Sequence, residues 1–167
     1  LRIGNLFTDV GEAARSTEFL RQGLAVYVAL AAEQPGNAEI RHDLATAYND
    51  LGMVLEEWGD ATGALEQHRK AMALREEFVA TDPADARRRR DLAATHVNLG
   101  RALVLSGDIA AGLASNRNGL VIAANLVADD PSNADYRRLL AISYQNDGDY
   151  RAILRDTRGA LDSFGKK

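Results

Sequence analysis

The side chains that could carry catalysis or bind a metal ion are few and far apart in this sequence. Its three histidines, His42, His68 and His96, lie at no i, i+3 or i, i+4 spacing, so no two of them suit a zinc site on one helix. The sequence has no cysteine, which removes disulfides, thiolate metal sites and thiol catalysis. No glycine-rich loop followed by Lys-Ser/Thr is present to hold a phosphate. We therefore expect no enzyme, no metal site and no cofactor.

Two groups of charged residues are the remaining candidates for chemistry. Glu56, Glu57 and Asp60 cluster near a predicted helix end, where acidic residues gather routinely, so a general acid–base pair is disfavoured. The run Arg87–Arg90 could bind phosphate or an acidic peptide. Consecutive side chains on a helix point about 100° apart, however, and four guanidinium groups in a row do not form one patch. Both groups are interpreted as helix surface.

The overall charge and hydropathy exclude two classes of partner. The formal net charge is -4 with both signs interspersed, so neither nucleic acid nor anionic lipid is expected to bind. No apolar run approaches the roughly 20 residues that a membrane-spanning helix needs, and residues 1–10 lack the pattern of a secretory leader. The absence of cysteine is compatible with either redox compartment, and the cytoplasm is favoured.

The elements that would position any site recur every 48 residues. The only three prolines, Pro35, Pro83 and Pro131, are separated by this interval. The same shift superposes four glycines, which are Gly4, Gly52, Gly100 and Gly148. A fixed period of this length is the signature of a repeat array, in which each unit buries its apolar face against its neighbours.

Each repeat unit predicts two helices, A and B, joined by a short turn. In the second unit, helix A is expected over residues 37–58 because Leu44, Leu51 and Leu55 recur at helical spacing. Gly59-Asp60 ends this helix and starts helix B, since glycine suits a left-handed turn and aspartate caps the following helix. Helix B is expected over 61–80. Later units place their helices at 85–106, 109–129 and 133–154.

The whole chain is expected to be one all-α domain, an α-α superhelix of antiparallel helix hairpins. Gly11-Glu12 lines up with Gly59-Asp60 and predicts a turn in the first unit. The expected units are 1–36, 37–84, 85–132 and 133–167, of which the first and last are partial. We therefore expect a fragment of a longer protein, with repeat ends exposed to weak self-association.

The small residues of these helices resemble those of the tetratricopeptide repeat, in which a small residue on helix A lies against another on helix B. The pairs here are Gly52 with Ala64, Gly100 with Gly112, and Gly148 with Ala160. The family repeats every 34 residues, and the excess of 14 falls as seven residues in each helix. Seven residues are about two turns, so each apolar stripe keeps its neighbour. HEAT or armadillo repeats are the alternative fold.

The last unit departs from the family pattern at two positions. Asp147 replaces the leucine that precedes the small glycine of helix A, and Arg155 replaces the glycine of the turn between the helices. The resemblance is therefore weakest in the last unit.

The resemblance implies a non-catalytic scaffold that binds a protein or peptide on a concave surface lined by helix A. The implied contact residues are Asn5, Asn49, Met53, Glu56, Val97, Asn98, Arg101, Gln145, Asn146 and Asp149, with Glu57 and Val104 beside them. Asparagine and glutamine side chains there could hydrogen-bond a peptide backbone, although plain solvated surface is the competing interpretation. The basic residues with which one subtype of the family captures a C-terminal carboxylate are missing, which disfavours chaperone tails.

The wider role expected from this resemblance is a regulatory part of a larger bacterial signalling protein. The alternative is a structural array that assembles with copies of itself through its exposed ends. An enzyme would need a pocket in which groups with shifted pKa values converge.

Overall fold

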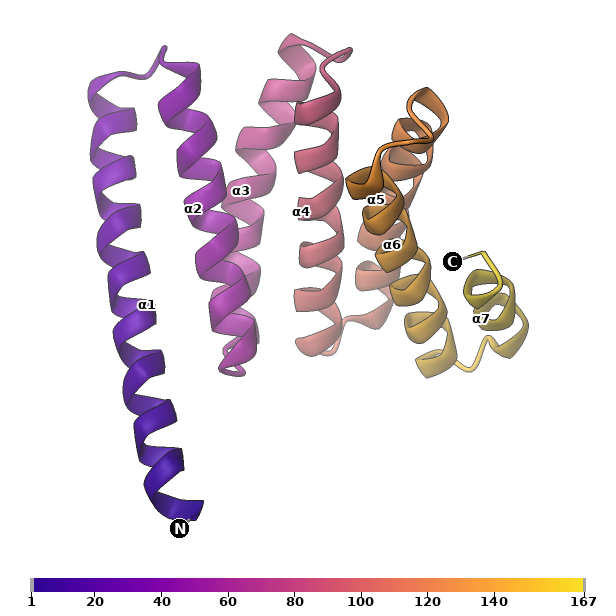
Figure 1. The fold of residues 1–167 in the computed structure, drawn as a ribbon, viewed down its shortest axis with the longest axis horizontal. Helices are drawn as coiled ribbons and strands as arrows, with labels where there is room; N and C mark the ends of the chain where they lie inside the picture. Colours follow the sequence, from indigo (N-terminus) through magenta and orange to yellow (C-terminus); the bar gives the residue numbers. More distant parts are fainter. Residues whose placement is uncertain (1, 167) are drawn as a thin grey trace.

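Seven helices make up nearly all of the described chain (Figure 1). The computed structural model describes the backbone of residues 2–166 and the side chains of residue 15 and residues 17–166. The helices are α1 (Arg2–Glu33), α2 (Ala38–Glu57), α3 (Ala61–Thr81), α4 (Ala86–Leu105), α5 (Ile109–Asp129), α6 (Ala134–Ile153) and α7 (Thr157–Phe164). The all-α class is confirmed, and residues 2–166 contain no strand. None of the described helices is long and apolar enough to cross a membrane.

The helices fall into two alternating series. We call α2, α4 and α6 the A helices, and they begin at residues 38, 86 and 134, which are 48 apart. We call α3, α5 and α7 the B helices, and they begin at 61, 109 and 157 with the same interval. The helices end within one or two residues of the expected positions.

Side-chain caps explain where these helices begin. Before each of α2 to α7, an asparagine or aspartate accepts hydrogen bonds from backbone N–H groups of the first turn. Asp60, for example, accepts from the N–H of Gly63 at 2.8 Å. The preceding turns contain Gly59 and Gly107 at φ values of 78° and 96°, the left-handed region that glycine enters without strain. Local chemistry therefore sets both the end of each complete A helix and the start of the next B helix.

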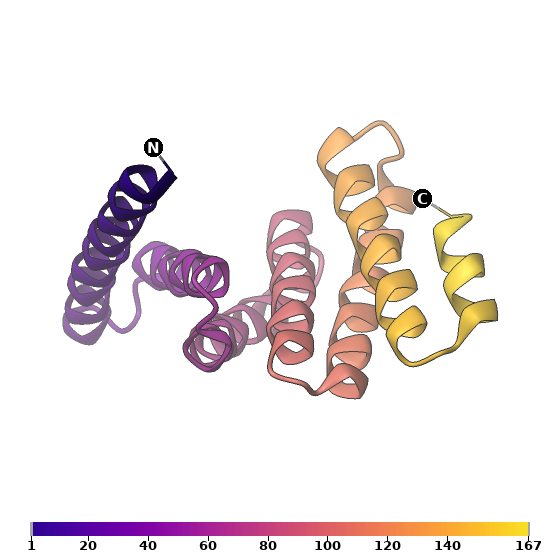
Figure 2. The same cartoon turned by 90° about the horizontal axis from the view of Figure 1, so that it is seen from below.

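The packing order gives the array an inner and an outer side. Each helix packs on the next along the chain, and α2 also contacts α4, as α4 contacts α6. The described parts of α3 and α5 do not contact each other. Figure 1 shows the A helices in front of α3 and α5, and Figure 2 gives the view from below. The array therefore curves toward the A helices, whose exposed side we call the inner face.

The predicted close approach of small residues is confirmed in the hairpin of α4 and α5. A Cβ atom on Gly100 would lie 2.8 Å from the carbonyl oxygen of Gly112, and one on Gly112 would lie 2.7 Å from that of Gly100. In the other two hairpins the atoms nearest to the glycine belong to a side-chain ring on the B helix. Gly52 faces the His68 ring, with a built Cβ 2.6 Å from it, and Gly148 faces Phe164. Both partners lie 16 residues after their glycine, one turn beyond the alanine, and their rings fill the space that glycine leaves.

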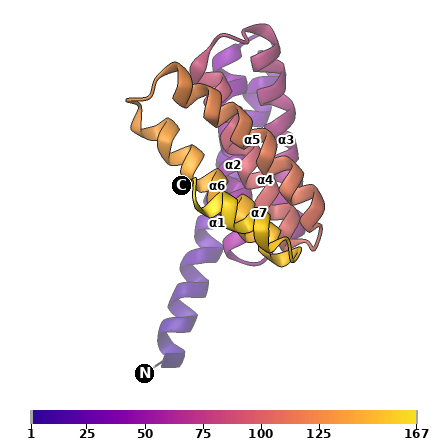
Figure 3. The ribbon, with the colours of Figure 1, turned by 90° about the vertical axis from the view of Figure 1, so that its right-hand side faces the viewer.

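The turn predicted at Gly11-Glu12 is wrong, because α1 runs through it without a break. Glutamate is a poor N-cap compared with the aspartate of the later turns, and the alanines that follow favour an uninterrupted helix. α1 is consequently 32 residues long, and its N-terminal part extends beyond the other helices (Figures 1 and 3).

The departure at Asp147 puts a carboxylate inside the last hairpin. Its side chain is 4% exposed and accepts hydrogen bonds from Arg117 Nε at 3.0 Å and Ser163 Oγ at 2.7 Å, with Arg151 as a third donor. Burial alone would raise the pKa of Asp147, but these hydrogen bonds outweigh burial and lower it. The charge is therefore retained inside the hairpin by two guanidinium groups, where the earlier units have leucine.

The departure at Arg155 leaves an ordinary residue in a glycine conformation. Arg155 has φ 62°, the one positive φ among the described non-glycine residues, and occupies the place of Gly59 and Gly107. We predict that Arg155→Gly stabilises the fold by about 1 kcal/mol, because a side chain is strained in this region. The melting temperature and the amide exchange of α7 measure this stabilisation. Arg158→Gly, inside α7, is the matched control and should destabilise the fold. A higher stability of Arg158→Gly, or no higher stability of Arg155→Gly, contradicts the prediction.

Substitution of Gly100 tests the close helix crossing. Gly100→Ala should destabilise by about 1–3 kcal/mol, because the new methyl group meets backbone atoms that cannot move aside. Gly23→Ala is the control, since that glycine lies exposed in α1 with nothing within 4 Å of a built Cβ. There alanine should gain up to about 1 kcal/mol in helix propensity. Urea unfolding of both variants measures the difference, and equal effects would refute a close crossing.

Candidate functional site

The inner face is built from side chains that the A helices present at successive turns. On α4, for example, residues 94, 98, 101 and 105 follow one another at helical spacing and lie along one side of the helix. Because α4 contacts both α2 and α6, these positions meet those of the neighbouring A helices. The contact residues expected from the sequence differ in how they lie relative to this surface.

Two of the expected contact residues hydrogen-bond each other across the seam between α2 and α4. Asn98 Nδ2 donates to Asn49 Oδ1 at 2.9 Å, and Asn49 Nδ2 lies 3.5 Å from the sulfur of Met53. Asn49 is only 8% exposed, whereas Met53 is 38% exposed. Asn49 therefore supports the face from below, and Met53 and the half-buried Asn98 form its surface.

Glu56 lies below the same seam in a buried ion-pair network. One carboxylate oxygen lies 3.0 Å from Nε2 of His68, which is fully buried, and the other accepts a hydrogen bond from Nε of Arg101. Arg101 keeps 44% of its side chain exposed. Glu56 thus ties α2 to both α3 and α4, and only Arg101 of the three reaches the surface.

Val97 is a correction to the expected set. It is 4% exposed and packs with Ala93, Ala123 and Leu139 in an apolar cluster shared by α4, α5 and α6. A side chain so buried has no surface to offer a partner, and its role is packing.

The remaining expected residues lie near the two ends of the chain. On α6, Gln145 Nε2 donates to both carboxylate oxygens of Asp149 at 3.0 and 2.9 Å, and Asn146 is half-buried beside them. Asp149 itself is exposed. Asn5 falls among the residues whose side chains lie outside the described part, so its place on the face stays a prediction.

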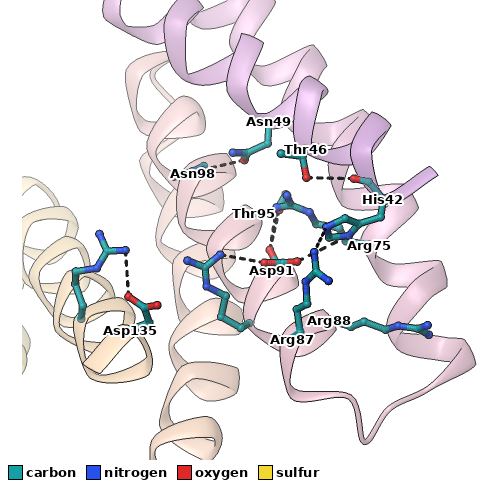
Figure 4. A network of polar contacts seen from close by, with 12 residues as sticks. His42, Thr46, Asn49, Arg75, Arg87, Arg88, Asp91, Thr95, Asn98 and Asp135 are labelled. Atoms are coloured by element: carbon teal, nitrogen blue, oxygen red, sulfur yellow. Dashed lines mark hydrogen bonds and ion pairs between the residues drawn. The ribbon is translucent and has the colours of Figure 1, made fainter. Parts of the chain in front are cut away.

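The sequence did not predict a hollow of about 480 Å³ between the first halves of the A helices. Figure 4 shows the polar network around it. Its polar lining comes from α2, α3, α4 and α6 and includes His42, Asn49, Arg75, Arg87, Asp91 and Asp135. One signal could have found this place: His42 and Arg90 are separated by 48 residues, and both line the hollow.

The four consecutive arginines are confirmed to point in different directions. Arg87 bonds to His42, Arg88 to the carbonyl of Phe78, Arg89 to Asp129, and Arg90 to Asp91. These contacts reach α2, α3 and α5, so the run joins α4 to its neighbours. Arg87 and Arg90 nevertheless both line the hollow.

No catalytic or metal-binding constellation emerges within the described residues. No three or more His, Asp or Glu side chains there are arranged to hold a metal ion. Burial lowers the pKa of His96 and raises the pKa of Tyr150 to about 12, but these rings lie on different helices and do not line the hollow.

Comparison with known proteins identifies the middle of the chain. Residues 44–82 match the model of the tetratricopeptide repeat family, a segment that covers most of α2 and all of α3. With seven consecutive helices packed neighbour to neighbour, the chain is a tetratricopeptide-like repeat array. A search of curated proteins found no match. Repeats of this family generally mediate protein–protein interaction and are typically non-catalytic.

Removal of the Glu56 carboxylate tests whether it supports the inner face. Glu56→Ala should destabilise by about 1–3 kcal/mol, because His68 stays buried and loses its hydrogen-bond partner. Glu57→Ala is the matched control at the neighbouring exposed position and should change stability by less than about 0.5 kcal/mol. Chemical denaturation followed by circular dichroism measures both. Similar values for the two variants would contradict a supporting role for Glu56.

Proposed function

We propose that the inner face binds a protein partner through an extended segment and that the chain is a non-catalytic interaction module. The main support is the combination of exposed apolar side chains with amide and guanidinium groups on the A helices. In peptide-binding grooves, polar groups hydrogen-bond the peptide backbone, and apolar side chains select among the side chains of the peptide.

The apolar part of this proposed surface extends beyond the residues expected from the sequence. Leu105 lies about one turn after Arg101, and Ile153 about one turn after Asp149. Ile142 lies one turn before Asn146. With Met53, these side chains are between 38% and 55% exposed, although each is large and apolar. Burying them against a partner would be favourable by about 25 cal/mol per Å² of apolar area.

The contact set that we propose is the accessible part of the expected one. It comprises Met53, Asn98, Arg101, Gln145, Asn146 and Asp149, and Asn5 belongs to it by sequence position alone. Asn49 and Glu56 hold these residues in place. Neighbouring helix axes lie about 8–10 Å apart, so the axes of the three A helices span roughly 16–20 Å. An extended segment covers this distance with about five to six residues.

The wider context is also part of the proposal. We propose that the repeat units are residues 1–36, 37–84, 85–132 and 133–167, because the sequence pattern recurs at these intervals. We also propose that the chain is a regulatory part of a larger signalling protein, as the family resemblance suggests.

Self-assembly is the second candidate, supported by apolar side chains near the two ends of the array. Phe19 on α1 is 73% exposed and Leu161 on α7 is 67% exposed. Light scattering over a concentration series separates the candidates, because a molecular mass that stays monomeric at high concentration excludes assembly.

A peptide selection tests the main proposal. Random 12-residue peptides, displayed with their C-termini fused, are selected on the immobilised chain. We expect enriched peptides whose affinity falls about tenfold or more in Met53→Glu, since a charge would replace an apolar contact. Val121→Glu is the matched control, because Val121 is 57% exposed on α5, away from the A helices. Absence of enriched peptides, or an equal loss in both variants, contradicts binding at the inner face.

A further inference from the structure

Arg75 is a buried guanidinium group with no carboxylate partner among the described residues. Its side chain reaches from α3 toward α4 and is 6% exposed. Nη1 donates to the carbonyl of Asp91 at 3.0 Å and to Thr95 Oγ1. Nε is buried without a hydrogen-bond partner, and Nη2 makes no hydrogen bond within the described chain. Nη2 is therefore the donor of Arg75 that remains for a further acceptor.

The repeat architecture does not require an arginine at this position. The residue one period later is Ala123, which is fully buried in the apolar cluster with Ala93 and Val97. The fold therefore accommodates a small apolar residue there. A buried charge without an ion-pair partner is unfavourable, and burial lowers the pKa of Arg75 although Asp91 and Asp50 oppose the shift. Packing alone leaves Arg75 unexplained.

Arg75 lines the hollow between the first halves of the A helices (Figure 4). At about 480 Å³, the hollow has the volume of a site for one side chain or small molecule. Arg87 lines it as well, and within the described part of the chain its side chain bonds only to His42 Nε2, at 3.1 Å. With Arg90, three guanidinium groups from two helices thus border one space.

Most of the carboxylates around the hollow are already paired. Asp91 lies 3.0 Å from Arg90 and 3.9 Å from His42, and Asp135 lies 3.8 Å from Arg138. Asp50 is the remaining lining carboxylate, and it is exposed to solvent. The unpaired charges are therefore two guanidinium groups against one carboxylate, which leaves room for one additional negative charge. A doubly charged phosphate would meet repulsion from all three aspartates.

We propose that the hollow binds the carboxylate of one acidic side chain, aspartate or glutamate, in the partner segment. This inference rests on the proposed binding of a partner at the inner face and names one feature of that partner. The carboxylate bonds to Nη2 of Arg75 and to Arg87. The rest of the segment then continues across the A helices toward Met53.

The peptide selection described above also tests this inference. We expect one fixed position of the enriched peptides to be Asp or Glu. Replacing that residue by its amide should weaken binding about tenfold or more, since hydrogen bonds to charged groups are the stronger ones. Arg87→Gln should cause a similar loss and reduce the effect of the peptide substitution, since Arg75 is then the remaining partner. Arg69→Gln, at an exposed position on α3 outside the hollow, is the matched control and should bind normally.

Arg75→Met is the second variant, with its folding checked by circular dichroism and melting temperature. If Arg75→Met folds, it should lose affinity for the peptide as Arg87→Gln does. If it does not fold, the comparison of Arg87→Gln with the amide-substituted peptide is the test of the carboxylate site. Peptides that bind the inner face without a fixed acidic position overturn the carboxylate site and leave the proposed function standing. A phosphoserine peptide that binds more tightly than the glutamate peptide also overturns it. Failure to enrich any peptide contradicts the proposed function itself.

Discussion

The close crossing of paired helices is the constraint on which the rest of this structure depends. At Gly100 and Gly112 two backbones approach so nearly that a methyl group on either would meet the carbonyl oxygen of the other. This approach fixes how each hairpin is rotated and therefore which side chains reach the inner face. In the flanking hairpins the same space is filled by the rings of His68 and Phe164, so glycine on the A helix is required there for a different reason.

Polar groups join the units alongside the apolar clusters that helices of neighbouring units share. Glu56 joins three helices through His68 and Arg101, and Asp147 joins the last three through its arginine partners and Ser163. Buried charges need such partners to remain stable, which makes their geometry exacting. The inner face consequently has a layer of paired polar groups beneath its accessible residues.

Local signals made most of the fold predictable from sequence. Capping residues such as Asn37 and the glycines of the turns act within a few residues, so the helix ends could be placed closely. Rotation of one helix against another is not a local property. The contact of Gly52 with His68, the burial of Val97 and the bond between Asn49 and Asn98 depend on it, which is why sequence position alone assigned them incorrectly or not at all.

The contact pattern of the helices has a mechanical consequence. The A helices touch their next-but-one neighbours, whereas α3 and α5 do not touch. Straightening the array must therefore break contacts between α2 and α4, such as the hydrogen bonds that Asn98 and Arg101 donate. The outer helices α3 and α5 share no contact that would oppose this motion. Tension along the protein would flatten the inner face and separate the helices that line its hollow. A pulling force and the binding of a ligand in the hollow would therefore oppose each other.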